Sequence, residues 1–255
     1  MIANCSHDEK GNSHGGAAGD QGGEFVVRSW YSRPWRCVLH HPTASVRKLI
    51  AKIARQMADN NNIGYDQWQR LTLNRALAKV GWNPSKVTTK CETDCSASTT
   101  AAVKAAGHQL GIAKLANIDE STTTYNMRSR FSAAGFQVLT DQKYLSSASW
   151  IVEGDILLND DHHVAINLTD GRYAASTATN PYAEPTTIQK KGSKGTGVKW
   201  VQWHLRRLGY SLGSYGIDGD FGSMTDKAVR AFQKKYGLVV DGQVGKNTRA
   251  KLKSV

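Results

Sequence analysis

Asp94-Cys95-Ser96 is the most informative stretch for the fold of the first part of this chain. It is followed at once by the run Ala97-Ser-Thr-Thr-Ala-Ala-Val-Lys-Ala-Ala-Gly107. Its small residues predict a closely packed helix, with Cys95 at the helix start. A thiol at that place feels the positive end of the helix dipole, which favours the thiolate form. The stretch therefore predicts both a buried helix and a reactive cysteine.

A histidine that could act as a base for this thiol lies further along the chain. Gly154-Asp155 precedes His163-Val164-Ala165-Ile166, an apolar run that is typical of a strand. An imidazole next to a thiol can take its proton and activate it for attack on a carbonyl carbon. We therefore predict a cysteine peptidase or amidase with Cys95 as nucleophile and His163 as base.

Residues next to this pair are the first candidates for contacts with the substrate. They are Asp94, Ser96 and His162. If the segment around His163 is extended, His162 points to the opposite face, because successive side chains of a strand alternate. We expect His162 to be exposed or to lie behind the reacting pair.

The four cysteines do not predict a metal site. Cys91 and Cys95 are spaced as C-x3-C, and no second pair of Cys or His follows at the distance found in zinc fingers. We expect Cys5, Cys37 and Cys91 to be free thiols, and we expect no metal and no other cofactor.

Periodicity along the chain predicts helices first and strands afterwards. The first 25 residues are polar and Gly-rich and are typical of a loop. Helices are expected over 46–59, 67–80, the run after Cys95, and 123–134, and short strands over 136–139, 155–158, 163–168 and 172–175. Helices followed by a run of strands indicate an α+β domain with an antiparallel sheet.

The last quarter of the chain contains an internal repeat. Asp218-Gly-Asp-Phe-Gly-Ser-Met-Thr225 returns 23 positions later as Asp241-Gly-Gln-Val-Gly-Lys-Asn-Thr248. Apolar stripes between the copies predict a small all-α domain of three helices. We place the domains at 1–176 (with an extension over 1–44) and 196–255, joined by a Pro- and Gly-rich linker over 177–195.

The net charge of +12 is concentrated in this tail. Residues 190–255 contain 14 Lys and Arg against 4 Asp and Glu. This excess predicts an anionic partner, which could be a cell-wall polymer, a nucleic acid or a membrane surface. No apolar run reaches the ~18 residues of a membrane span.

The tail closely resembles peptidoglycan-binding domains of the PG-binding-1 type. The resemblance rests on Val201-Gln202, Gly209-Tyr210, Ala228-Val229, Phe232-Gln233, Gly237-Leu238 and both copies of the repeat. It implies that the tail binds peptidoglycan rather than nucleic acid or membrane. The Asp-Gly repeats form turns and carry no recognition-helix pattern.

The front part resembles NlpC-type cysteine peptidases over about residues 45–180. Asp94-Cys95-Ser96-Ala97 and His163-Val164-Ala165-Ile166 carry the resemblance. It implies a papain-like fold, with Tyr65 helping to stabilise the oxyanion. The family's third polar residue falls on Ala174, which cannot orient an imidazole. Either Ser176 or Asn180 takes that role, or the orienting residue comes from elsewhere in the chain.

Together the two resemblances imply an endolysin of a phage or prophage, a peptidoglycan hydrolase. We expect a γ-D-glutamyl–diamino acid endopeptidase; the alternatives are an N-acetylmuramoyl-L-alanine amidase and a non-catalytic wall-binding protein of papain-like shape. The polar segment Met1–Lys10 lacks the apolar region of a secretory signal. We therefore expect the protein in the cytoplasm of an infected or lysogenic host, acting on the wall after release. The sequence leaves the oligomeric state open.

Overall fold

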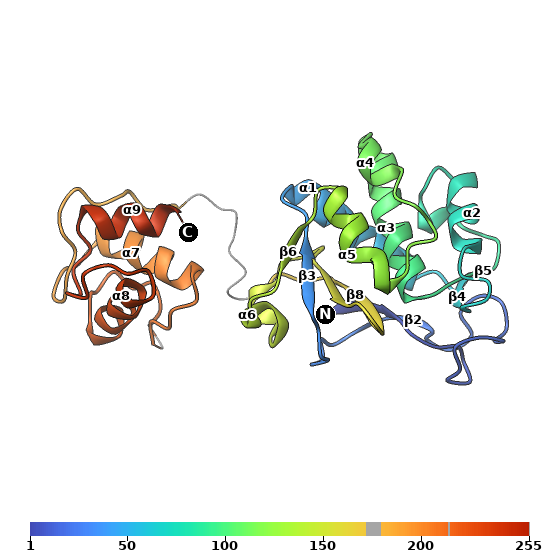
Figure 1. Cartoon of the computed structure of the whole chain (residues 1–255), viewed down its shortest axis with the longest axis horizontal. Helices are drawn as coiled ribbons and strands as arrows, with labels where there is room; N and C mark the ends of the chain where they lie inside the picture. Colours follow the sequence, from blue (N-terminus) through green and yellow to red (C-terminus); the bar gives the residue numbers. More distant parts are fainter. Residues whose placement is uncertain (172–179, 214, 255) are drawn as a thin grey trace. The chain divides into compact units, whose positions relative to one another are not determined.

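The structure, a computed structural model, describes residues 1–171, 180–213 and 215–254. The chain divides into two compact units, Met1–Arg172 and Tyr173–Val255 (Figure 1). Part of the expected linker over 177–195 lies outside the described residues, so the domain limits stay a prediction. No helix in the described residues has the length and apolarity needed to cross a membrane.

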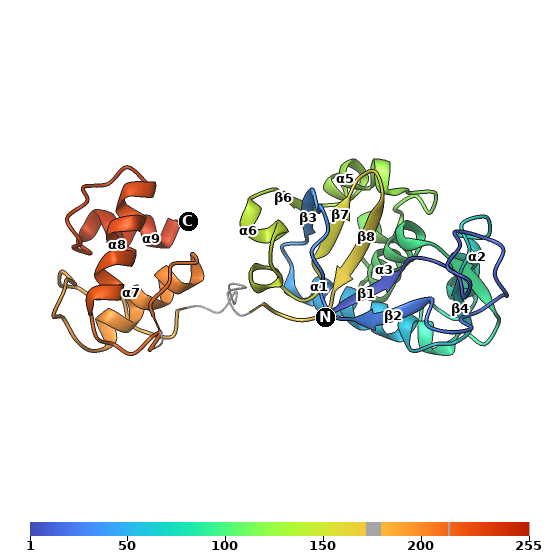
Figure 2. The same cartoon turned by 90° about the horizontal axis from the view of Figure 1, so that it is seen from below.

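A mixed α/β architecture is found in the N-terminal unit. Its described residues contain a six-stranded sheet in the order β2-β1-β8-β7-β3-β6, in which every neighbouring pair is antiparallel. The strands are β1 (Ile2–Cys5), β2 (Phe25–Arg28), β3 (Cys37–His40), β6 (Gln137–Leu139), β7 (Ile156–Asn159) and β8 (His163–Asn167). The expected antiparallel sheet is confirmed, and Figure 2 shows β3, β7, β8 and β1 side by side.

The main hydrophobic core lies between this sheet and the helices α1 (Ala44–Ala58) and α3 (Cys95–Leu110). Val164 and Ile166 of β8 belong to this core, whereas the intervening Ala165 belongs to a second cluster on the other face. The alternation follows from the period of two along a strand. Because His163 starts β8 in the same register as Ala165, its side chain extends toward the second cluster.

The small residues of α3 allow the close packing that its sequence predicts. Ala101, Ala102, Ala105 and Ala106 are completely buried. A Cβ atom on Gly107 would lie 2.3 Å from the backbone nitrogen of Ala116 in α4 (Ala113–Ala116), so only glycine fits there. This tight packing fixes the start of α3 relative to the sheet.

The prediction that the first 25 residues form a loop is wrong. β1 lies between β2 and β8 in the interior of the sheet. The segment contains only four residues and includes the polar Asn4, so its strand signal is weak. Pairing with β2 and β8 supplies the hydrogen bonds that hold it in place.

Other elements differ from the expected ones in detail. The strands β4 (Ile63–Tyr65) and β5 (Cys91–Thr93) were not predicted; they form a small parallel pair. The predicted helix over 67–80 begins later, as α2 (Thr72–Lys79). Trp68 lies outside the core; it is 76% exposed and its ring stacks on His14. The expected strand over 172–175 lies outside the described residues.

The remaining elements of the N-terminal unit are short, apart from one helix. They are η1 (Pro84–Lys86), α5 (Thr124–Ala133), α6 (Gln142–Leu145) and η2 (Ala148–Trp150). α5 covers the helix predicted over 123–134.

The C-terminal unit is helical, as its sequence predicts. Its described residues contain α7 (Thr196–Arg207), α8 (Ser223–Lys235) and α9 (Lys246–Ser254) around a core of its own. A buried glutamine closes each copy of the internal repeat. Gln202 donates to Asp218 Oδ1 and accepts from the Gly219 amide, and Gln233 does the same with Asp241 and Gly242.

Candidate active site

Cys95 is the first residue of α3, and a dense network holds this helix start. Asp94 caps the helix by accepting a hydrogen bond from the Ala97 amide at 2.7 Å. Arg70 pairs with Asp94 at 2.5 Å and also donates to the Ser96 hydroxyl and to the Thr122 carbonyl. Asp94 and Ser96 are therefore engaged in holding the helix, and neither lines the pocket described below.

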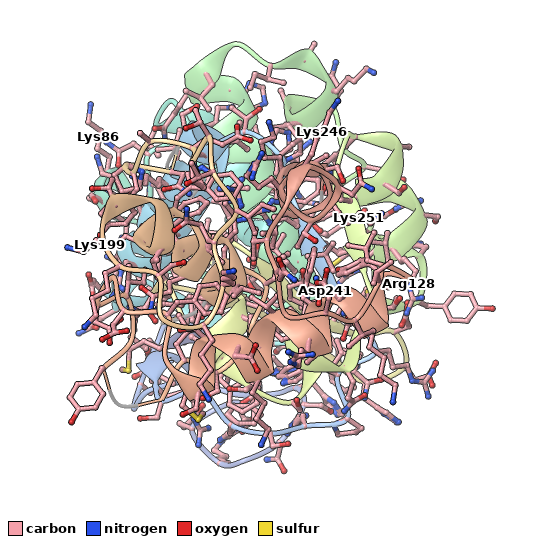
Figure 3. The ribbon with its side chains drawn as sticks, turned by 90° about the vertical axis from the view of Figure 1, so that its left-hand side faces the viewer. Lys86, Arg128, Lys199, Asp241, Lys246 and Lys251 are labelled. Atoms are coloured by element: carbon pink, nitrogen blue, oxygen red, sulfur yellow. The ribbon has the colours of Figure 1, made fainter. Side chains whose placement is uncertain are left out.

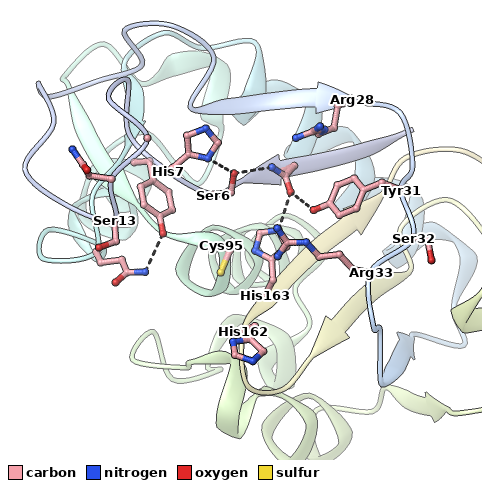
Figure 4. Close-up of a pocket in the computed structure, with 15 residues that line it drawn as sticks. Ser6, His7, Ser13, Arg28, Tyr31, Ser32, Arg33, Cys95, His162 and His163 are labelled. Carbon is pink, nitrogen blue, oxygen red and sulfur yellow. Dashed lines mark hydrogen bonds between the residues drawn. The ribbon is translucent and has the colours of Figure 1, made fainter.

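His163 opens β8 and is 3% exposed. Its Nε2 lies 2.8 Å from Oδ1 of Asn4, and the same oxygen accepts a hydrogen bond from the Tyr31 hydroxyl at 2.9 Å (Figure 4). The amide nitrogen of Asn4 is directed to the Ser6 hydroxyl. An amide oxygen can only accept, so Nε2 of His163 carries the proton and Nδ1 keeps its lone pair. This is the tautomer in which Nδ1 can act as a base.

Asn4 is the polar partner that the sequence analysis missed. Of the two residues expected in this role, Ser176 lies outside the described residues. Asn180 belongs to the C-terminal unit, where its side chain donates to the Trp200 carbonyl. The signal for Asn4 is weak: a single amide in a four-residue apolar strand, far in sequence from His163.

A pocket of about 660 Å³ brings the predicted pair together. Cys95 and His163 both line it, and Cys95 also accepts a backbone hydrogen bond from Val164, the residue after His163. Figure 4 shows both side chains facing this space. Within the residues that the structure describes, no hydrogen bond joins the thiol to the imidazole.

Burial controls the protonation of both groups. It raises the pKa of the Cys95 thiol to about 12, with a further contribution from the Asp94 charge; amides of Val164 and Ser96 and the Arg70 charge oppose this. Burial also lowers the pKa of His163 to about 4, assisted by Arg33 and Arg28. Both shifts favour a neutral thiol and a neutral imidazole. Desolvation of the sulfur thus opposes the thiolate that the helix dipole favours.

Tyr65 and His162 both line the pocket. The hydroxyl of Tyr65 accepts a hydrogen bond from Gln67 at 3.0 Å, which leaves its own proton free to donate. Burial raises the pKa of Tyr65, so the hydroxyl stays protonated. His162 is exposed and lies in a turn rather than in the strand.

The rest of the lining is polar and carries positive charge without any acidic residue. Arg28 and Arg33 both lie near the Tyr31 ring, with their guanidinium carbons 5.1 and 5.5 Å from its centre. In the described part of the chain neither arginine has an ion-pair partner. The pocket therefore suits a substrate with an anionic group near the bond that reacts.

No three His, Cys, Asp or Glu side chains in the described residues are placed to hold a metal ion. All four cysteines are free thiols.

Comparison with protein families gives two matches. A model described as an endolysin-like domain matches residues 2–174, and a model described as a putative peptidoglycan-binding domain matches residues 194–252. The first match covers more than half of the chain and contains the whole pocket.

Curated relatives share shorter segments. N-acetylmuramoyl-L-alanine amidase CwlL of Bacillus licheniformis is 39% identical over 89 residues, which are 35% of this chain and 24% of the amidase. A spore cortex-lytic enzyme of Oceanobacillus iheyensis is 38% identical over 74 residues, 29% of this chain and 26% of the enzyme. The chain thus spans about a quarter of the length of these relatives.

Similar solved structures are also partial matches. A peptidoglycan-binding protein of Clostridioides difficile, in complex with glutamine hydroxamate, is 49% identical over 26% of this chain and 40% of its own, with a TM-score of 0.25. The N-terminal domain of SleB is 37% identical over 28% of this chain and 93% of its own, with a TM-score of 0.26.

Proposed function

The chain belongs to the endolysin-like domain family, and from this premise we propose that it is a peptidoglycan hydrolase. The N-terminal unit cuts an amide bond in the peptide part of the wall, and the C-terminal unit binds the wall. The main support for catalysis by the N-terminal unit is that Cys95, His163 and Asn4 meet at one pocket. The peptidoglycan-binding match of residues 194–252 supports the other half.

The geometry suggests how the reaction proceeds. Cys95 Sγ attacks the carbonyl carbon of the substrate amide while Nδ1 of His163 takes the thiol proton. Since burial favours the neutral form of both groups, we infer that proton transfer accompanies attack. The C–N bond then breaks, and the imidazolium gives this proton to the leaving amine. Water, activated by the same nitrogen, releases the acyl group from sulfur.

Two donors can stabilise the negative charge that develops on the carbonyl oxygen. The backbone amide of Cys95 stands at the start of α3, and the Tyr65 hydroxyl has its proton available because Gln67 occupies its acceptor side. Asn4 holds the imidazole ring in place and fixes its tautomer. Hydrogen bonds hold the Asn4 and Tyr65 side chains in place without substrate. Donors that are already placed stabilise a developing charge most effectively.

For the bond that is cut, we propose the amide between N-acetylmuramic acid and L-alanine. The relatives named as N-acetylmuramoyl-L-alanine amidases support this bond over the γ-D-glutamyl–diamino acid bond. The second bond stays as the alternative, because the motifs around Cys95 and His163 resemble those of endopeptidases that cut there.

Mass spectrometry of digested sacculi tests both parts of the proposal. An amidase releases peptides with a free N-terminal L-alanine and leaves glycan without peptide. An endopeptidase leaves a dipeptide on the sugar and frees the amino group of the diamino acid. Cys95→Ala should release neither product, whereas Cys91→Ala should behave as wild type. New reducing sugar ends without new amino groups would show a glycosidase and reject the proposal.

A further inference from the structure

The two copies of the internal repeat form two equivalent pockets in the C-terminal unit. The first pocket is lined by Leu212, Gly213, Tyr215, Asp218, Asp220, Gly222, Ser223, Met224 and Thr225. Its six residues from Asp218 onward each have their counterpart 23 positions later in the lining of the second pocket, from Asp241 to Thr248. The pockets are therefore one structural feature built twice.

The same side-chain network supports the floor of each pocket. The amide nitrogen of Gln202 donates to Asp218 Oδ1 at 2.7 Å and to the Thr225 hydroxyl at 3.2 Å. In the second copy Gln233 donates to Asp241 Oδ1 at 2.8 Å and to the Thr248 hydroxyl at 3.3 Å. Each network turns one carboxylate and one threonine toward the pocket in the same way.

The carboxylate of each floor is a charged acceptor. A hydrogen bond from the Asp220 amide, followed by that from Gln202, lowers the pKa of Asp218. For Asp241 the hydrogen bond from the Gln243 amide has the same effect. Both groups are ionised at neutral pH and can accept charge-assisted hydrogen bonds from ligand hydroxyl or amide groups. Figure 3 labels Asp241 together with Lys246 of the second copy.

Exposed apolar side chains collect at these two pockets. The large exposed apolar residues described in the C-terminal unit are Ile188, Tyr215, Met224, Val239 and Val240. Tyr215 and Met224 line the first pocket, and Ile188 and Val239 line the second. Tyr215 is 85% and Val239 78% exposed, so each pocket has apolar surface at its rim that a ligand can cover.

From this duplication we propose that the C-terminal unit has two glycan subsites, each binding one N-acetylated hexosamine unit of a polysaccharide strand. A sugar of this kind has hydroxyl and amide donors for the carboxylate, and a ring face and acetyl methyl for the apolar rim. The volumes of about 480 and 300 Å³ lie within the lower part of the ~300–1,000 Å³ range of small-ligand sites. Two copies of one site suit a polymer of repeating sugars better than a single short peptide.

The proposal rests on the proposed wall binding and adds to it the ligand class and the number of sites. The two subsites differ in charge. The first has a second carboxylate, Asp220, paired with Lys194 at 3.0 Å, where the second has the neutral Gln243. The second adds the exposed Lys246 where the first has Ser223. We expect the second subsite to favour a sugar that carries a carboxylate, such as the lactyl group of muramic acid.

Calorimetric titration of the full chain, carrying Cys95→Ala to prevent digestion, tests the proposal. The probes are the N-acetylglucosamine disaccharide, peptide-free glycan strands prepared from sacculi, and free stem peptide. We expect two disaccharides per chain, and strands that bind at least tenfold more tightly because one strand occupies both subsites. Met224→Asp and Val239→Asp should each reduce the disaccharide count from two to one and weaken strand binding at least tenfold.

Exposed neighbours provide matched controls. Val240→Asp changes a residue beside Val239 that lines neither pocket and should leave both readouts unchanged. Tyr215→Ala should weaken strand binding, whereas Tyr125→Ala, at an equally exposed tyrosine of the N-terminal unit, should not.

The possible failures are distinguishable. If the chain binds sacculi but the pocket variants bind strands as tightly as wild type, the glycan subsites are rejected and wall binding stands. Stoichiometric binding of free stem peptide without binding of glycan would assign the unit to the peptide instead. A chain that ignores intact sacculi would overturn both the wall-binding function and the subsites.

Discussion

Asn4 has the largest expected effect among the single residues that do not react with the substrate. It accepts hydrogen bonds from both His163 Nε2 and the Tyr31 hydroxyl, and so joins three side chains from three segments. Without it, the imidazole can rotate or adopt the tautomer in which Nδ1 is protonated. Asn4 is therefore a positioning residue that acts through His163.

We expect Asn4→Ala to lower kcat about 10–100-fold with little change in KM, because general-base catalysis is worth roughly 10²–10⁴-fold when the base is correctly placed. Turbidity loss of purified sacculi and cleavage of a soluble muropeptide measure this. Asn12→Ala is the control, since Asn12 lines the same pocket and makes no bond to His163. An equal loss in both variants, or a loss confined to KM, would contradict the positioning role.

The pH dependence of the reaction follows from the surroundings of His163. Burial, and then the Arg33 and Arg28 charges, lower the pKa of His163 to about 4, so the neutral base is present above that pH. We expect kcat/KM to fall only as pH drops toward 4. Removing a positive charge by Arg33→Ala should raise the pKa of His163 and move the acid limb up by about 0.5–1 pH unit.

Arg36→Ala is the matched control for this shift. Arg36 is paired with Asp161 at 2.6 Å and does not line the pocket. Its replacement should leave the acid limb in place. An unchanged profile in Arg33→Ala would mean that His163 is not the base that limits kcat/KM.

At the scale of elements, the long segment between β1 and β2 is held against β4 and β5 by carboxylates. Glu92 of β5 accepts a hydrogen bond from the Gly19 amide at 2.6 Å, and Glu24 accepts one from the Tyr65 amide at 2.7 Å. The second oxygen of Glu92 is buried without a partner. Burial, together with the Glu24, Asp66 and Glu9 charges, raises the pKa of Glu92 to about 7.

This raised pKa has a definite consequence for stability. The folded state holds a proton on Glu92 that the unfolded state releases near pH 4.5, so the contribution to stability falls as pH rises from 4.5 through 7. We expect Glu92→Gln to be more stable than wild type by about 2–3 kcal/mol at pH 8 and nearly equal at pH 4. Denaturant unfolding at both pH values measures this. Glu153→Gln, a partly exposed position, should show no such difference; a wild type that is more stable than Glu92→Gln at pH 8 would refute the prediction.

At the scale of the whole molecule, the two units have separate hydrophobic cores. The described core residues of one fall between positions 2 and 168 and those of the other between 198 and 252. Catalytic and wall-binding properties should therefore be separable.

We expect a chain that ends at residue 179 to lyse intact cells at least tenfold more slowly, while cleavage of a soluble muropeptide changes less than twofold. The excess of 14 basic over 4 acidic residues in 190–255 predicts that rising salt also weakens wall binding, since exposed charges are screened within ~8 Å at physiological ionic strength. Sedimentation with sacculi between 50 and 500 mM salt measures this salt-dependent contribution to wall binding. Equal losses on cells and on the soluble fragment would show that the two units do not work independently.

Features that depend on a local pattern of residues could be predicted from the sequence alone. The small residues after Cys95 specify α3, the short continuous apolar runs specify β7 and β8, and the repeated Asp-Gly motifs specify the helical C-terminal unit. In each of these the signal lies within about ten neighbouring residues. Cys95 and His163 could be proposed for the same reason, because each stands in a distinctive local context.

Features that depend on contacts between distant residues became visible in the tertiary structure alone. β1 is a strand because β2 and β8 pair with it, and Asn4 reaches His163 across 159 positions of sequence. The protonation of Cys95 was also beyond the sequence, since the helix dipole is a local property and desolvation depends on everything that packs around the sulfur. Burial and long-range pairing depend on contacts throughout the fold, so no short stretch of sequence specifies them.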